Sequence, residues 1–242
     1  MKKLLGVLGG MGPMATADFF RKLIEETPAH CDEDHVPVII YSVPQMPNRT
    51  RAIMGTAESP VPQMLAGLRA LRTEGAAFVA IPCNTAHFWY NELCREGGLP
   101  IIHIVDAVTD ELSHHDGTDQ PLGLLATEAT LSARIYHDRL SERGIKVIVN
   151  SQEERDEFVN AGIELVKRGR FREAGVAVQE AIVRLRERGA QKLVLGCTEL
   201  PVAIEAGAAS SLPICIDATR ALARACVKHA LQPLASHAHT KG

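Results

Sequence analysis

The sequence predicts an α/β protein with two pseudo-symmetric lobes, each with a mostly parallel sheet flanked by helices, and an active site in the cleft between the lobes. Short apolar runs alternate with segments of helical periodicity, a pattern typical of parallel sheets covered on both faces. The same plan also occurs twice, because LRTEGAAFVAIPC at 71–83 matches LRERGAQKLVLGC at 185–197. GVLGG, starting at Gly6, likewise matches GLLAT, starting at Gly123.

The first half starts with LLGVLGG at 4–10, which we interpret as a buried strand entering a turn. With the two preceding lysines this run also resembles a signal peptide, but glycines and Pro13 interrupt it. Apolar residues keep helical spacing over 61–71, and Gly75 is expected to end that helix. FVAIP at 78–82 then predicts a strand that leads to Cys83.

The second half repeats these elements, with helical spacing over 178–185, a stop at Gly189 and a strand that leads to Cys197. We expect residues 1–107 plus 217–242 to form the first lobe and residues 108–216 to form the second. The lobes should meet near 105–112, and the helix at about 217–232 should pack on the first lobe. Ligands bind at the carboxyl ends of strands in such sheets, where both cysteines fall.

Composition excludes several classes of protein. The 242 residues include 26 Lys and Arg against 29 Asp and Glu, so no basic surface for nucleic acid is expected. No apolar run reaches the roughly 20 residues of a membrane span. The six cysteines form no C-x-x-C pair, which argues against zinc and against a disulfide framework. A cytoplasmic protein with reduced thiols is therefore expected.

The sequence around each repeated cysteine favours reactive thiols. CNTAH at 83–87 places a cysteine at a strand end and polar residues at a helix start, where Asn84 or Thr85 could be the N-cap. Free N–H groups and the helix dipole should lower the pKa of the Cys83 thiol. GCTE at 196–199 repeats the arrangement. In the alternative interpretation both cysteines are buried structural residues, and His87 only orients the helix start.

Two thiols that face each other suit one reaction type. One group removes a proton from one face of a carbon, and the other delivers a proton to the opposite face. The expected chemistry is inversion at a carbon next to a carboxylate.

At this point the chain resembles a known family, the cofactor-independent aspartate/glutamate racemase superfamily, and most closely its aspartate racemase branch. The resemblance spans most of the chain. The segments that carry it are GVLGGMGPMAT (6–16), PNRT (47–50), IPCNTAH (81–87), GLLAT (123–127) and LGCTE (195–199).

The resemblance implies a homodimer that exchanges the α-proton of an amino acid without pyridoxal phosphate, metal or other cofactor. Cys197 matches the base that deprotonates the L-enantiomer, and Cys83 matches the base that deprotonates the D-enantiomer. The implied substrate contacts are Met11, Asn48, Arg49, Asn84, Thr85, Thr127, Lys167, Thr198 and Glu199. Thr130 is carried over only weakly.

Two cations are assigned by the same resemblance to the side-chain carboxylate of the substrate. Arg49 follows two prolines in what should be an irregular loop, and its planar fork suits a carboxylate. Lys167 matches the second cation, although Arg168 is adjacent and the register could slip by one. In the alternative interpretation each is a solvated surface charge.

The resemblance leads to L- and D-aspartate as the predicted substrates. Gly9-Gly10-Met11 and Glu199 stand where glutamate racemases carry Asp-Ser-Gly and a histidine, which argues against a glutamate racemase of the peptidoglycan type. A broad-specificity or glutamate-acting racemase of the superfamily is the alternative. The distant alternatives are an inactive amino-acid sensor and an NAD-dependent oxidoreductase, because Gly10–Ala15 formally matches G-x-G-x-x-A.

Overall fold

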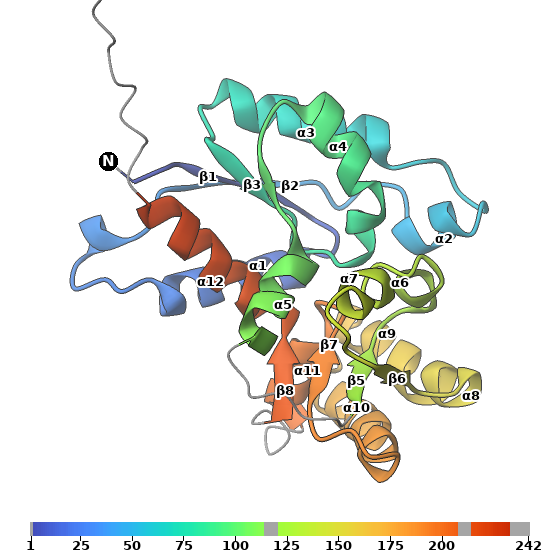
Figure 1. Cartoon of the computed structure of the whole chain (residues 1–242). Helices are drawn as coiled ribbons and strands as arrows, with labels where there is room; N and C mark the ends of the chain where they lie inside the picture. The colour runs from blue at the N-terminus through green and yellow to red at the C-terminus, as the bar shows by residue number, and fades with distance from the viewer. Residues whose placement is uncertain (1, 114–120, 208–213, 233–242) are drawn as a thin grey trace, which may run out of the picture.

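Two four-stranded sheets, parallel throughout, form the framework of the protein (Figure 1). This computed structural model describes residues 2–113, 121–207 and 214–232. The first sheet has the order β2-β1-β3-β4, and the second repeats it as β6-β5-β7-β8. The strands are β1 (Leu5–Gly9), β2 (Val38–Ser42), β3 (Phe78–Ala80), β4 (Ile101–Ile102), β5 (Leu122–Leu125), β6 (Val147–Val149), β7 (Leu193–Leu195) and β8 (Cys215–Asp217). The predicted fold class is confirmed.

Helices connect the strands and cover the sheets. In the first half they are α1 (Pro13–Glu26), η1 (Asp32–Asp34), α2 (Arg49–Ile53), α3 (Val61–Thr73), η2 (Thr85–Trp89), α4 (Tyr90–Gly97) and α5 (Ile104–Ser113). In the second half they are α6 (Glu128–Ser132), α7 (His137–Ser141), α8 (Gln152–Glu154), η3 (Arg155–Asn160), α9 (Ala161–Lys167), α10 (Phe171–Glu187), α11 (Leu200–Gly207) and α12 (Ala218–Leu231).

The sequence repeat corresponds to one structural unit in each lobe. Helices α3 and α10 are each followed by a glycine in the left-handed region, Gly75 at φ 86° and Gly189 at φ 95°. A side chain is strained at such φ values, so glycine is required where the chain turns back into β3 or β7. The residues after these strands are therefore presented at the carboxyl end of each sheet.

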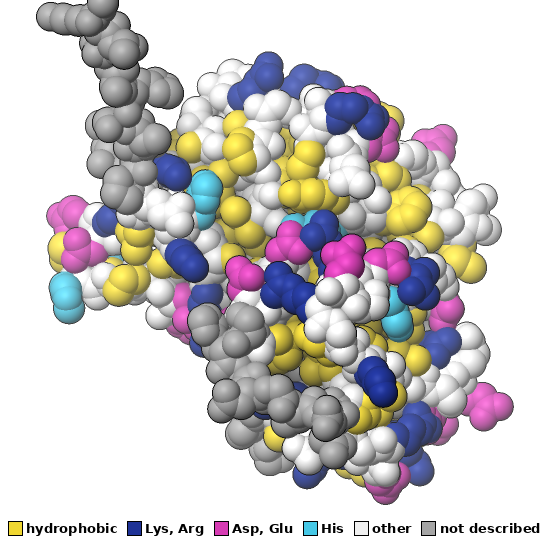
Figure 2. Space-filling model, in the orientation of Figure 1, with side chains coloured by type: hydrophobic (Ala, Val, Ile, Leu, Met, Phe, Trp, Pro, Cys, Tyr) yellow, Lys and Arg dark blue, Asp and Glu magenta, His cyan; other side chains and the backbone are white. Residues whose placement is uncertain are grey.

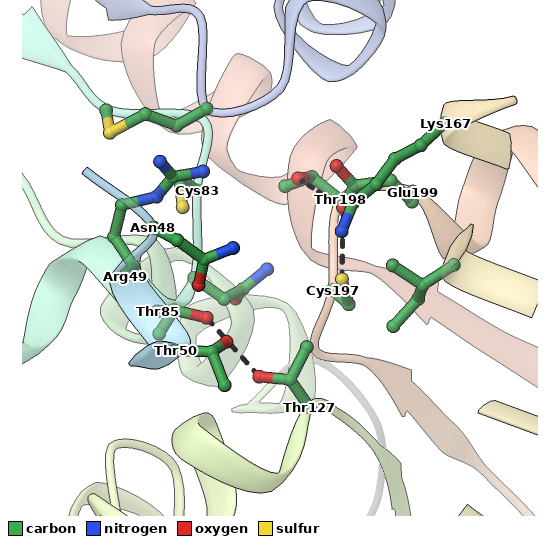
Figure 3. Close-up of a pocket in the computed structure, with 13 residues that line it drawn as sticks. Asn48, Arg49, Thr50, Cys83, Thr85, Thr127, Lys167, Cys197, Thr198 and Glu199 are labelled. Carbon is green, nitrogen blue, oxygen red and sulfur yellow. Dashed lines mark hydrogen bonds between the residues drawn. The ribbon is translucent and has the colours of Figure 1, made fainter. Parts of the chain in front are cut away.

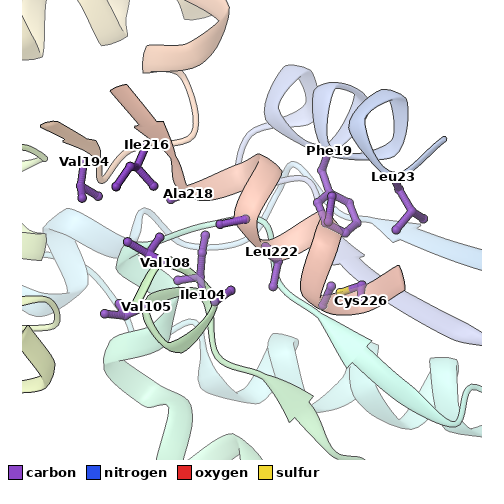
Figure 4. Close-up of a cluster of buried hydrophobic side chains, with 14 of the residues drawn as sticks. Phe19, Leu23, Ile104, Val105, Val108, Val194, Ile216, Ala218, Leu222 and Cys226 are labelled. Atoms are coloured by element: carbon purple, nitrogen blue, oxygen red, sulfur yellow. The ribbon is translucent and has the colours of Figure 1, made fainter. Parts of the chain in front are cut away.

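Three buried clusters make up the core. One lies against α3 and α4 in the first lobe, and a second lies against α9, α10 and α11 in the second lobe. The third contains side chains from both sheets and from α1, α5 and α12, including Phe19, Val108, Val194 and Leu222 (Figure 4). Because this cluster is continuous across both halves, the hydrophobic effect holds the lobes together.

Helix α12 leaves the second sheet after β8 and packs against α1 and α5. The start of this helix is fixed by a buried ion cluster, in which Lys22 Nζ lies 2.5 Å from both Asp18 and Asp217. Asp217 also caps α12 by accepting from the backbone N–H of Thr219 at 2.8 Å. This packing is consistent with the proposed assignment of α12 to the first lobe. Residues 233–242, which belong to the same predicted segment, lie outside the described residues.

Charged side chains gather across the middle of one face, between the two lobes (Figure 2). Ion pairs join α5 to α7 and to the turn after α7, where Arg139 meets Asp106 and Arg143 meets Asp110. No helix in the described ranges is both long and apolar enough to cross a membrane.

Candidate active site

One pocket lies at the carboxyl ends of both sheets. Cys83 follows β3 and Cys197 follows β7, and both thiols line this cavity of about 60 Å³. Figure 3 shows the two cysteines on different sides of the pocket, Cys83 beside Arg49 and Cys197 beside Glu199. The lining residues are Met11, Asn48, Arg49, Thr50, Cys83, Asn84, Thr85, Thr127, Ile163, Lys167, Cys197, Thr198 and Glu199.

Apart from the weakly assigned Thr130, every residue that the sequence analysis assigned to catalysis or substrate contact lines this pocket. Two lining residues were missed, Thr50 and Ile163. Thr50 is the last residue of the PNRT motif, and Ile163 lies one helical turn before Lys167 on α9, so both carried a usable signal. Thr130, the weak candidate, is fully buried and lies behind the pocket lining.

The backbone after Cys83 differs from the predicted helix start. The chain enters a short 3₁₀ helix, η2, and Asn84 already has helical angles of φ −58° and ψ −50°. Asn84 stands at the N-cap position of η2, as predicted, but its side chain makes no cap hydrogen bond there. The Asn84 side chain is instead held from the other lobe, because the hydroxyl of Tyr136 donates to its Oδ1 at 2.5 Å.

The prediction of a lowered pKa at Cys83 is wrong. Burial raises the pKa of this thiol, because the charged form loses its hydration. The Arg49 guanidinium and the backbone N–H of Ala86 act in the opposite direction and have a smaller effect. Free Cys83 is therefore a protonated thiol near neutral pH, with a cation beside it.

Cys197 has an acidic neighbour instead. Its thiol donates to Glu199 Oε2 at 3.0 Å, and the Thr198 hydroxyl donates to the same oxygen at 3.4 Å. Burial, followed by the negative charge of Glu199, raises the pKa of Cys197 well above its usual value. The two thiols thus lie in different electrostatic surroundings despite their equivalent positions in the repeat.

His87 supports the loop that carries Cys83. Its Nδ1 donates to the Cys83 carbonyl at 3.0 Å, and its Nε2 accepts from the backbone N–H of Ile104 at 3.2 Å. These bonds require the neutral ring, and burial lowers the pKa of His87 to about 4. The interpretation in which His87 orients a helix start agrees with this geometry, although the helix is α5 rather than the one after Cys83.

The candidate cations approach from different elements. Arg49 begins α2 rather than lying in an irregular loop, because the Asn48 side chain caps this helix by accepting from the N–H of Arg51. Arg49 donates to the carbonyls of Met46 and Pro47 and leaves its buried Nε without a partner among the described residues. The backbone contacts thus hold Arg49 at the pocket, and its Nε–H remains available to donate to a ligand.

Lys167, not Arg168, lines the pocket. Its Nζ lies 2.7 Å from Glu164, and this partner raises the pKa of Lys167 against the opposing effect of burial. The lysine is consequently charged at neutral pH and adds a second cation to the pocket.

Three threonine hydroxyls connect the lobes at the floor of the pocket. Thr85 lies 3.0 Å from Thr130 and 3.4 Å from Thr127, and Thr127 lies 3.0 Å from Thr130. Thr85 belongs to the first lobe and the other two to the start of α6. The pocket therefore depends on both lobes.

The glycine-rich turn after β1 packs against its own chain. A Cβ on Gly10, which has a φ of 90°, would lie 2.4 Å from the backbone of Val43, and one on Gly9 would lie 2.4 Å from Thr16. Packing within the chain therefore explains why these positions are glycine, and no bound dinucleotide is needed to explain them. Within the described ranges, no group of three or more His, Cys, Asp or Glu residues is placed to hold a metal ion.

Known proteins of similar sequence and fold align with this chain over nearly its whole length and theirs. The model of the Asp/Glu/hydantoin racemase family matches residues 8–226. The broad specificity amino-acid racemase RacX of Bacillus subtilis is 28% identical and aligns over 93% of this chain and 96% of its own. An aspartate racemase from Picrophilus torridus is 31% identical, with a TM-score of 0.82 and 96% of each chain covered. An aspartate racemase homologue from Pyrococcus horikoshii is 27% identical, with a TM-score of 0.74, covering 96% of this chain and all of that one.

Proposed function

The chain belongs to the Asp/Glu/hydantoin racemase family and is an isomerase of the amino-acid racemase type, and from this premise we propose that it interconverts L- and D-aspartate. The observation that carries the proposal is the presence of two thiols, Cys83 and Cys197, in one small pocket together with two cations. The reaction uses the two cysteines as its acid and base and takes no cofactor.

The cations support a substrate with two carboxylates. Arg49 and Lys167 both line the pocket that holds the two thiols. Arg49 is half-buried and Lys167 lies at the exposed rim of the pocket, so an anionic group between them gains Coulomb attraction that a neutral group lacks. The similarity to the aspartate racemase of Picrophilus torridus supports the same substrate.

Proton transfer from L-aspartate starts at Cys197. Glu199 accepts the thiol proton through the existing hydrogen bond, which leaves a thiolate. This thiolate removes the α-proton from one face of the substrate and becomes a thiol again. Cys83 then gives its own proton to the opposite face, so that D-aspartate forms and Cys83 is left as a thiolate. From D-aspartate the steps run in reverse.

The two thiolates are stabilised differently. The Cys197 thiolate forms when Glu199 becomes neutral, so no two negative charges coexist there. The Cys83 thiolate is stabilised by Arg49, whose charge favours the deprotonated form. After D-aspartate leaves, proton exchange with water restores Cys83 and deprotonates Glu199.

The carbanion needs hydrogen-bond donors at the α-carboxylate, because charge flows into that group as the proton leaves. Asn84 offers a buried Nδ2 that has no partner within the described part of the chain. The hydroxyls of Thr85, Thr127 and Thr198 also line the pocket. Glu199 faces Cys197 with Oε2, so its Oε1 is available to accept a hydrogen bond from the α-ammonium group, a contact that the neutral carboxyl also provides.

A second candidate function is racemisation of a broader set of amino acids, which the similarity to RacX favours. The two candidates share the thiol chemistry and differ in the use of Arg49 and Lys167. The proposal extends to a homodimer, as the family resemblance implies, and to a cytoplasmic location, which the pattern of unpaired cysteines favours.

The test is incorporation of deuterium at the α-carbon in heavy water, followed by mass spectrometry and chiral chromatography without added cofactor. Aspartate, glutamate and a panel of neutral amino acids are compared. The proposal expects exchange and inversion, with aspartate preferred. Equal exchange across the panel would favour the broad-specificity function, and exchange in none of them would favour an amino-acid sensor.

A further inference from the structure

We infer that Tyr136 is a positioning residue, whose hydroxyl orients the Asn84 amide so that Nδ2 is left to bind the α-carboxylate of the substrate. This inference rests on the proposed function, because it assigns the carboxylate contact of the same pocket. Tyr136 does not line the pocket itself.

The contact is buried and comes from the opposite lobe. Tyr136 is fully buried between α6 and α7, and Asn84 is 2% exposed directly after Cys83. The two side chains meet at 2.5 Å through the tyrosine hydroxyl and Asn84 Oδ1. The other end of this amide, Nδ2, is buried in the pocket lining and has no partner among the described residues. A buried amide N–H₂ without a partner is costly, so a ligand that accepts from it is expected.

The direction of this hydrogen bond decides what the pocket presents. A tyrosine hydroxyl can donate or accept, but Asn84 Oδ1 is the acceptor that the Tyr136 hydroxyl has among the described residues. The amide with its oxygen toward Tyr136 therefore leaves no buried O–H unpaired, and it turns the nitrogen toward the ligand. The reversed amide would place a partial negative charge against the carboxylate. Burial, together with Cys197 and Asp217 nearby, raises the pKa of Tyr136, so its hydroxyl stays protonated.

The same contact links substrate binding to the arrangement of the lobes. Asn84 belongs to the first lobe and Tyr136 to the second, and the neighbouring Thr85 makes its hydroxyl contacts with the second lobe as well. Asn84 Nδ2, the donor to the substrate carboxylate, is therefore oriented only while the two lobes keep Tyr136 and Asn84 in contact.

The experiment compares Tyr136→Phe with the matched control Tyr90→Phe in the full chain. Tyr90→Phe also removes a hydroxyl. That hydroxyl donates to the Ile101 carbonyl at 3.3 Å and not to Asn84. Binding is measured by calorimetry with 2-methylaspartate, which has no α-proton to exchange, and kinetics are measured by deuterium incorporation. Tyr136→Phe should weaken binding and raise KM about three- to tenfold with a smaller change in kcat, as expected for one lost hydrogen bond. Tyr90→Phe should leave both within twofold of the wild type.

The Asn84→Ala background distinguishes orientation from general packing. There Tyr136→Phe should add no further loss of 2-methylaspartate affinity, and a full additional loss would overturn the inference. Equal affinity in Tyr136→Phe and the wild type would overturn it too.

Asn84→Asp serves if Tyr136→Phe fails to fold, because it keeps an acceptor for Tyr136 and replaces Nδ2 by a carboxylate oxygen. It should abolish 2-methylaspartate binding, and wild-type affinity would contradict the inference. Absence of deuterium exchange in the wild type would refute the proposed function alone, since the binding arm is read separately.

Discussion

The thiol of Cys197 donates a 3.0 Å hydrogen bond to the carboxylate of Glu199, two residues further along the chain. Its counterpart in the repeat, Cys83, has the guanidinium of Arg49 beside it instead. A duplicated fold has thus placed an acid next to one thiol and a cation next to the other. In the proposed mechanism the two proton transfers are chemically equivalent at the substrate, although the two thiols have different charged neighbours in the free protein.

Glu199→Gln should make Cys197 more acidic and the enzyme slower. The negative charge of Glu199 raises the pKa of Cys197, so its removal lowers that pKa. The proton acceptor is lost at the same time, which should reduce kcat about 10²- to 10⁴-fold. The checks are the pH dependence of iodoacetamide modification at Cys197, followed by mass spectrometry, and the rate of racemisation.

Glu205→Gln is the matched control, because Glu205 lies on α11 and pairs with Arg21 outside the pocket. Glu205→Gln should change neither the pKa of Cys197 nor the rate of racemisation. A Glu199→Gln enzyme with a more acidic Cys197 and undiminished kcat would show that Glu199 accepts no proton.

Arg49→Met should reduce affinity for the second carboxylate selectively. Hydrogen bonds to charged groups contribute about 1.5–3 kcal/mol, which corresponds to a loss of about 10- to 150-fold. Calorimetry with 2-methylaspartate and the neutral 2-aminoisobutyrate measures the selectivity without catalysis. Arg49→Lys should retain part of it, since the charge remains while the fork is lost. A parallel loss for both compounds would contradict this role for Arg49.

Lys167→Gln and Arg168→Gln form a matched pair of adjacent cations. Lys167 lines the pocket and Arg168 does not, so only the first substitution should weaken 2-methylaspartate binding. The expected loss is again about tenfold or more. If Arg168→Gln has the larger effect, the register inferred for α9 is wrong.

His87 should make the fold sensitive to acid. Burial lowers its pKa from 6.5 to about 4, so the unfolded chain takes up a proton first as the pH falls. Stability present at neutral pH is therefore lost progressively below about pH 6.5. This one residue should reduce the free energy of unfolding by about 2 kcal/mol between pH 7 and pH 5.

Urea unfolding of the wild type and His87→Gln at both pH values measures the effect. The variant should be less stable at pH 7 and should lose less stability on acidification. An unchanged difference between pH 7 and pH 5 would mean that His87 is not held neutral by the fold.

The repeated pattern was sufficient to predict the architecture. Gly75 and Gly189 both end helices with positive φ, and both repeated cysteines follow the expected strands. Arg49 and Lys167, which the family resemblance assigned to the substrate, both line the pocket.

The errors arose where the second lobe alters the local chemistry of the first. The sequence around Asn84 is typical of an N-cap, but the Asn84 side chain bonds instead to Tyr136, which is distant in the sequence. The pKa of Cys83 was expected to fall with the helix field, whereas burial between the lobes raises it. Both effects depend on tertiary contacts that no short window of sequence contains.

Deuterium exchange by the single-cysteine variants tests the two-thiol account most directly. Cys83→Ala and Cys197→Ala are each incubated in heavy water with L- and D-aspartate, and α-deuterium and chirality are followed. Neither variant should invert the substrate, Cys83→Ala should label only L-aspartate, and Cys197→Ala should label only D-aspartate. Labelling of both enantiomers by one variant, or inversion by either, would contradict the assignment of one thiol to each face.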